Sequence, residues 1–157
     1  MTISVIGLNH KSASLDIREK YSFTGDACSL LLRRIKKIPE INEVLVISTC
    51  NRTEIYTDSE SGSDNIQNWL AGEKEYRPFI SHMYIHREED AIRHLFKVVS
   101  GLDSMVVGES EVLGQVKTSY KIALENKTID SKLKRLFEYS FSVAKNVRTN
   151  TDIGGNA

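Results

Sequence analysis

The order of short apolar segments in the first half of the chain does most to limit its fold. Residues 2–8 and 44–48 are apolar and rich in β-branched side chains, which is typical of buried strands. A polar segment, 49–52, separates the second of them from another β-branched stretch at 53–57. This spacing predicts a hairpin, in which Asn51 suits a left-handed turn position.

Helical patterns lie between and after these strands. Apolar residues recur at near-helical spacing over 28–38, where Pro39 ends the segment, and again over 66–70. Residues 82–86 are typical of a last strand. The resulting order, β-α-β-β-α-β, predicts an α+β fold with a ferredoxin-like sandwich over about residues 1–86.

The second half of the chain has helical patterns only. Apolar side chains recur on one face over residues 88–99, 111–124 and 131–149, and Asp130 can cap the last of these segments. We therefore expect a C-terminal helical bundle over about residues 87–157, following the sandwich.

The composition is that of an ordinary globular domain. The chain has 157 residues, enough for one domain, and its 40% hydrophobic and 27% charged residues exclude collagen-like and disordered classes. Its apolar runs are too short to cross a bilayer, and no basic segment precedes an apolar core at the N-terminus. Cys28 and Cys50 form no C-x-x-C pair, which argues against a disulfide framework and favours a reducing, cytoplasmic location.

Charge is unevenly spread along a chain whose formal net charge is zero. Residues 115–150 hold eight basic and three acidic side chains, so this segment carries +5 and the remainder −5. A basic segment of this kind fits a phosphate-bearing partner such as a nucleic acid. On charge alone, a solvated helix face explains the pattern equally well.

Cys50 is the residue with the clearest chemical potential. It ends a predicted strand and lies two residues before Arg52, and a nearby cation favours the nucleophilic thiolate. A structural cysteine in a turn explains the same spacing equally well. Cys28 differs, because its helical register with Leu32 and Ile35 predicts a buried, unreactive thiol.

Four histidines are candidate bases. His94 lies next to apolar residues on a helical segment, a setting typical of a packed structural histidine. His10 ends the first strand and is a rival base, because adjacent strand ends could bring it near Cys50. His82 and His86 share a face of the predicted last strand, and we interpret both as structural.

Polar side chains that could position a substrate lie in two separate segments. Arg52 offers a planar fork for a carboxylate, while Glu109, Glu111 and Gln115 could hold an ammonium or amide group. Taken singly, each of these residues is better explained as a solvated surface group.

The glycine pattern excludes the common nucleotide fingerprints. The nine glycines contain no G-x-G, and no Gly-Lys pair follows Gly108 at the spacing of a P-loop. The chain therefore has no Rossmann turn of its own for a nicotinamide cofactor. We also expect no metal site.

Three segments, 7–11, 48–54 and 94–117, together resemble glutamyl-tRNA reductase. They read GLNHK, STCNRTE and HLFKVVSGLDSMVVGESEVLGQVK, and the third is long and specific. The resemblance extends over nearly the whole chain but matches only the N-terminal catalytic domain of that family. It implies that an NADPH-binding domain and a helical dimerisation domain would follow Ala157 and are absent here.

The resemblance implies a catalytic role for Cys50. In this family the thiol attacks the ester carbonyl of glutamyl-tRNA, and hydride from NADPH reduces the resulting thioester to glutamate-1-semialdehyde for tetrapyrrole (porphyrin) biosynthesis. His94 matches a histidine that the family needs for activity, in contrast to the packed role that its neighbours suggest. The implied substrate-binding residues are Thr49, Cys50, Asn51, Arg52, Ser104, Glu109, Ser110, Glu111 and Gln115.

The whole enzyme implied by the resemblance is a cytoplasmic homodimer that uses NADPH and no metal. We expect the present chain to lack the reduction and to retain at most an esterase activity. Two other functions stay open. One is a non-catalytic module that binds tRNA or protein through its basic helices, and the other is an unrelated cysteine hydrolase with a Cys50–His10 pair.

Overall fold

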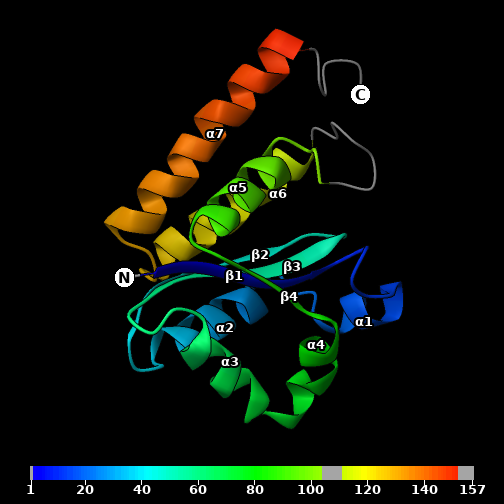
Figure 1. Ribbon diagram of the computed structural model, residues 1–157, viewed down its shortest axis with the longest axis vertical. Coiled ribbons are helices and arrows are strands. Elements are labelled where there is room, and N and C mark those ends of the chain that lie inside the picture. The colour runs from blue at the N-terminus through cyan, green and yellow to red at the C-terminus, as the bar shows by residue number, and fades with distance from the viewer. Residues whose placement is uncertain (1, 104–110, 152–157) are drawn as a thin grey trace.

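A four-stranded sheet lies at the centre of the protein (Figure 1). The structure is a computed structural model, and it describes residues 2–103 and 111–151. The strands are β1 (Thr2–Asn9), β2 (Ile41–Ser48), β3 (Arg52–Ser59) and β4 (Tyr84–Arg87). Their order is β2-β3-β1-β4, and every neighbouring pair is antiparallel. This is the order that a β-α-β-β-α-β succession predicts, because each helical connection skips one strand position.

Helices cover both faces of this sheet (Figure 1). Those on one face connect the strands: α1 (Leu15–Lys20), α2 (Asp26–Lys36), α3 (Asp64–Ala71), the 3-10 turn η1 (Lys74–Tyr76) and α4 (Arg77–His82). Those on the other face follow β4: α5 (Glu89–Val99), α6 (Glu111–Glu125) and α7 (Ser131–Thr151). Within the described ranges, none of the helices is both long and apolar enough to cross a membrane.

The prediction of a C-terminal helical bundle after the sandwich is wrong, because α5, α6 and α7 pack against the sheet. All of β3 is buried, and so is β1 beyond its first residue, so both faces of these strands need cover. Leu32 of α2 and Val116 of α6 are both fully buried and belong to one hydrophobic core. The helical half is therefore a layer of the same domain.

The predicted last strand begins two residues too early. The strand starts at Tyr84, and His82 instead ends α4, where its Nδ1 lies 2.8 Å from the carbonyl oxygen of Pro78. The predicted hairpin is present as β2 and β3. However, Asn51 does not have the left-handed backbone that we expected.

A carboxylate from the sheet caps α7. The backbone N–H groups of Asp130, Lys132 and Leu133 donate to the side chain of Glu43, with distances of 2.6, 3.2 and 3.0 Å. Glu43 lies on β2 and is only 4% exposed. We expected the side chain of Asp130 to cap this helix. The acceptor comes from a strand instead, and it ties α7 to the sheet.

Candidate active site

Cys50 lies in the turn between β2 and β3 with its side chain exposed. The hydroxyl of Thr49 accepts hydrogen bonds from the backbone N–H groups of Asn51 and Arg52, both at 3.2 Å. The N–H of Thr49 in turn donates to the carbonyl oxygen of Arg52 at 2.9 Å. These bonds close the turn without using the side chain of Cys50, which is an exposed residue. Cys28 is 2% exposed, as predicted, and burial raises the pKa of its thiol to about 11.

Arg52 points into the protein rather than toward solvent. Its side chain is 2% exposed, with Nη1 3.2 Å from Glu54 Oε2 and Nη2 3.0 Å from Asp103 Oδ2. We expected this fork to bind a carboxylate of the substrate. Both arms already hold carboxylates of the chain itself, so a substrate carboxylate would have to displace one of them.

Glu54 is the centre of a buried polar network. Besides the arm of Arg52, its carboxylate accepts hydrogen bonds from the hydroxyl of Tyr56 at 2.9 Å, from the hydroxyl of Tyr84 and from Nε2 of His94. Full burial alone would raise the pKa of Glu54. The hydrogen bond and charge of His94, the charge of Arg52 and the bond from Tyr84 outweigh it and lower the pKa to about 2. Glu54 is therefore ionised at neutral pH.

Gly7 leaves the space that this carboxylate needs. It lies opposite Glu54 in the β1–β3 register. A Cβ atom on Gly7 would be 2.7 Å from both Glu54 Cγ and the carbonyl oxygen of Thr53. A glycine at this position therefore allows Glu54 to lie flat against β1.

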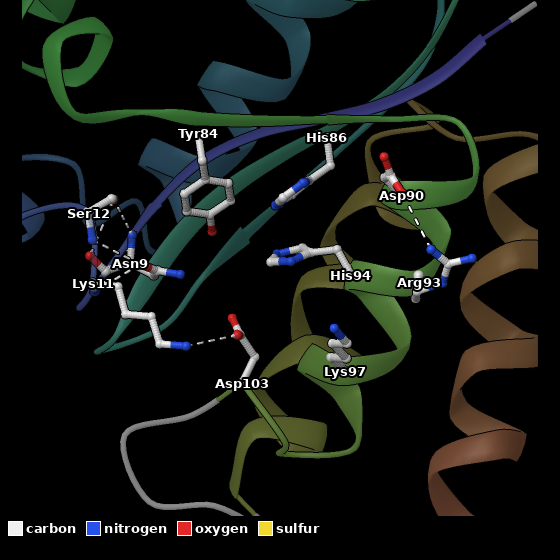
Figure 2. Close-up of a pocket in the computed structure, with 10 residues that line it drawn as sticks. All are labelled: Asn9, Lys11, Ser12, Tyr84, His86, Asp90, Arg93, His94, Lys97 and Asp103. Carbon is white, nitrogen blue, oxygen red and sulfur yellow. Dashed lines mark hydrogen bonds and ion pairs between the residues drawn. The ribbon is translucent and has the colours of Figure 1, made fainter.

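His94 projects from α5 toward the sheet and joins the network to a pocket (Figure 2). It is 9% exposed, and its bond to Glu54 satisfies Nε2. Its ring centroid lies 4.5 Å from that of His86 and 5.4 Å from that of Tyr84. Because an ionised carboxylate can only accept, Nε2 carries a proton and Nδ1 is the nitrogen left to exchange one.

The pocket beside His94 has a volume of about 560 Å³. Figure 2 shows its lining side chains, which are Asn9, Lys11, Ser12, Tyr84, His86, Asp90, Arg93, His94, Lys97 and Asp103. His86, which we interpreted as structural, is thus half-buried at the pocket. Cys50 does not line this pocket. The Arg52–Asp103 ion pair connects the Cys50 turn to its wall.

The second predicted substrate-binding segment is described only in part. Ser104, Glu109 and Ser110 lie outside the described residues. Glu111 begins α6 and is exposed. Gln115 lines a small cavity of about 150 Å³ together with Ser48, two residues before Cys50. The structure therefore brings α6 to the strand end that carries Cys50.

His10, the rival base, follows the end of β1. Its pKa is lowered by burial and then by the charges of Arg52 and Lys11, which favours the neutral imidazole. Its Nδ1 is buried and has no hydrogen-bond partner. The pairing of His10 with Cys50 stays a prediction.

Sequence reasoning missed Glu54, Tyr84 and Asp103 as members of the site. The alternation Arg52-x-Glu54-x-Tyr56 was the available signal, because side chains two apart on a strand share a face. Within the described ranges, no group of three or more histidine, cysteine or acidic side chains is arranged to hold a metal ion.

The sequence of the chain is similar to that of a known protein family. Residues 6–151 match the family described as glutamyl-tRNAGlu reductase, N-terminal domain. Two curated relatives are named glutamyl-tRNA reductase. The one from Xylella fastidiosa (strain M23) is 48% identical in sequence and the one from Xanthomonas campestris pv. phaseoli is 45% identical, and each alignment covers 99% of this chain. The chain spans only 35% and 36% of their lengths.

A solved structure agrees with the sequence match. Glutamyl-tRNA reductase from Methanopyrus kandleri superposes with a TM-score of 0.79 at 29% identity, covering 96% of this chain and 35% of that one. The family match spans most of the chain, from β1 to α7, and includes the Cys50 turn, Glu54 and His94. The chain therefore belongs to the family of glutamyl-tRNA reductase N-terminal domains.

Proposed function

We propose that this chain is the catalytic domain of a glutamyl-tRNA reductase and that Cys50 is its nucleophile. The observation that carries the proposal is the exposed thiol on a closed turn. An ester carried by a large RNA can meet only a thiol that lies open at the surface. Arg52, two residues after Cys50, anchors the turn in a buried ionic network, which holds the thiol in place.

The proposed step exchanges an oxygen ester for a thioester. The thiolate of Cys50 attacks the carbonyl carbon of the glutamyl ester, the bond from that carbon to the ribose oxygen breaks, and the ribose oxygen leaves as a hydroxyl after taking up a proton. Sulfur is a better nucleophile than a hydroxyl oxygen near neutral pH, because thiols in general ionise far more readily than alcohols. The thioester formed is also more electrophilic toward hydride than the ester was.

We assign His94 to proton exchange in this step, through Nδ1, and Glu54 to holding the imidazole. The support is the hydrogen bond from His94 to a carboxylate that stays ionised. A histidine fixed in this way presents one defined nitrogen to the reacting groups. We further propose that Thr49, Asn51 and Gln115 border the substrate.

We assign the reduction to the remainder of a full-length reductase. Every neighbouring pair of strands is antiparallel and the sequence has no G-x-G, so the described residues offer no Rossmann-type β-α-β turn for NADPH. The proposed whole enzyme is a cytoplasmic homodimer that forms glutamate-1-semialdehyde for tetrapyrrole biosynthesis.

Release of glutamate from glutamyl-tRNA tests the nucleophile. Without reduction, water resolves the thioester, so the chain should release glutamate slowly. Cys50→Ser should lower the rate at least about tenfold, because a serine hydroxyl is far less ionised. Cys28→Ser is the matched control and should leave the rate unchanged, since Cys28 is buried. An equal rate in Cys50→Ser and the unsubstituted chain would remove Cys50 from the mechanism.

Two further measurements separate the alternatives. If the chain only binds tRNA through its basic helices, binding should survive Cys50→Ser and fall steeply with ionic strength. If it is an unrelated Cys50–His10 hydrolase, simple esters should be cleaved as well as glutamyl-tRNA, and His10→Ala should abolish both activities.

A further inference from the structure

The pocket beside His94 has a basic rim with one unpaired cation. Its lining includes Lys11, Arg93 and Lys97. Asp103 lies 3.7 Å from the amino group of Lys11, and Asp90 lies 3.4 Å from the guanidinium of Arg93. Within residues 2–103 and 111–151, Lys97 has no ion-pair or hydrogen-bond partner, and Figure 2 shows its amino group at the pocket. The rim therefore offers a free positive charge to an anionic ligand.

The planar ring of His86 also lines this pocket. Tyr84 and His94 both use their polar atoms on Glu54. His86 packs its ring against theirs, at 5.4 and 4.5 Å between centroids, and within the described ranges it makes no hydrogen bond. Histidine rings stack on nucleobases in proteins that bind single-stranded RNA.

The pocket is also connected to the proposed nucleophile. Asp103 lines the pocket and pairs with Arg52, two residues after Cys50. In an aminoacylated tRNA the ester is carried by the ribose of the 3′-terminal nucleotide. That nucleotide must therefore lie close to the Cys50 turn while its ester is attacked.

We propose that this pocket binds the 3′-terminal nucleotide of the RNA substrate, with the base against His86 and the phosphodiester group at Lys97. The proposal rests on the proposed function. A volume of about 560 Å³ lies within the range of small-molecule sites. A glutamyl group has no ring to stack on His86 and no phosphate to bind the basic rim. The terminal nucleotide can make both of these contacts, so it fits this pocket better than the glutamyl group does.

Binding of a 5′-phosphorylated CCA trinucleotide tests the proposal without requiring catalysis. The probe should shift the NMR signals of the His86 ring. Lys97→Ala should weaken binding about fivefold and lower the salt slope of the binding constant by about 0.7, the value for one phosphate contact on a single strand. Lys36→Ala is the matched control, because Lys36 is an exposed helical lysine on the opposite layer, and it should change neither quantity.

A second pair of variants tests the stacking contact. His86→Ala should weaken trinucleotide binding about fivefold or more, whereas His86→Phe keeps a planar ring and should bind nearly as well as the unsubstituted chain. This pair also guards against misfolding, since a variant that only damaged the fold would not be rescued by phenylalanine. Equal affinities for His86→Ala and His86→Phe would overturn the stacking contact.

The outcomes separate this inference from the proposed function. The nucleotide assignment is wrong if Lys97→Ala and Lys36→Ala bind the trinucleotide equally, or if free glutamate displaces the trinucleotide from the pocket. Either result would leave the proposed function intact, provided that Cys50→Ser still releases glutamate more slowly than the unsubstituted chain. If glutamate release does not depend on Cys50, the proposed function fails, whatever the trinucleotide shows.

Discussion

Glu54 is fully buried and nevertheless ionised, because its neighbours supply donors on every side. Arg52 provides a guanidinium, Tyr56 and Tyr84 provide hydroxyls, and His94 provides an imidazole N–H. A buried carboxylate with fewer partners would take up a proton. The network therefore fixes both the charge of Glu54 and the orientation of His94.

The lowered pKa of Glu54 makes the stability of the protein sensitive to acid. Its pKa of about 2 lies below the ordinary value of 4.5, so the unfolded chain binds a proton first as the pH falls. The contribution, of the order of 3 kcal/mol, is complete above about pH 4.5 and is lost between there and about pH 2. Urea unfolding at pH 7, 4 and 3 should show this loss.

Two variants isolate the contribution of Glu54. Glu54→Gln should be less stable at pH 7 and should lose less stability on acidification, because the titrating group is gone. Glu125→Gln alters an exposed carboxylate and should follow the unsubstituted chain at each pH. Parallel pH profiles for the unsubstituted chain and Glu54→Gln would contradict the ionised state of Glu54.

Among the elements, β3 does most to join the site to the fold. Its side chains at 52, 54, 56 and 58 share the face that meets the α5–α7 layer. Tyr56 packs edge-on against Phe137 of α7, with ring centroids 5.2 Å apart, and Asp58 lies 3.4 Å from the amino group of Lys132. One strand therefore both carries the network and seats the last helix.

The close contact between β1 and β3 predicts a penalty for Gly7→Ala. The new Cβ would meet Glu54 Cγ and the Thr53 carbonyl oxygen at 2.7 Å, so the strands must separate or Glu54 must move. We expect a loss of about 1–3 kcal/mol in the free energy of unfolding. Gly114→Ala is the matched control: among the described residues, nothing beyond its chain neighbours and the backbone of its own helix lies within 4 Å of its Cβ position, and on helix α6 it should stabilise by up to about 1 kcal/mol. Equal effects of the two variants would contradict the packing described.

The cap on α7 predicts a second loss at the level of elements. Glu43→Ala removes the acceptor of three backbone N–H groups and should lower the free energy of unfolding by about 2 kcal/mol. Glu43→Gln keeps an acceptor oxygen and should lose less. Chemical denaturation measures both, and a loss from alanine no larger than that from glutamine would show that the carboxylate is not the cap.

For the whole molecule, a single core on both sides of the sheet predicts one cooperative unfolding transition. Trp69 is the only tryptophan and lies on α3, in the layer opposite α5–α7. Its fluorescence reports one layer, while far-UV circular dichroism reports all the helices. The two signals should change at the same denaturant concentration. Separate midpoints would indicate that the α5–α7 layer unfolds on its own.

Much of the fold could be predicted from local patterns. The apolar stretch around Val44–Ile47 and the polar turn after it gave the hairpin, and the strand–helix succession gave the sheet order. The same patterns misplaced the start of β4, because a run such as His82–Tyr84 has no clear period in so few residues. They also assigned the cap of α7 to its nearest acidic residue, since a cap from Glu43 comes from far along the chain.

Of the candidate site, only Cys50 and His94 could be predicted from the sequence. The spacing around Cys50 and the family segments pointed to an exposed thiol and to His94, and Cys50 is exposed. Whether the residues assigned to the substrate bind it stays a prediction. The inward orientation of the Arg52 side chain could not be predicted, because its partner Asp103 is 51 residues away in sequence.

The amino-acid sequence alone determined most of the strands and the longer helices, many of the positions that face a core, and which family the chain resembles, because these depend on side-chain type and short-range spacing. Only the tertiary structure decided that the helices of the second half cover the sheet, that Glu54 holds His94 from 40 positions away, and that His86 and Lys97 share a pocket. Periodicity shows that a face must be buried, but what buries it depends on how distant segments pack together.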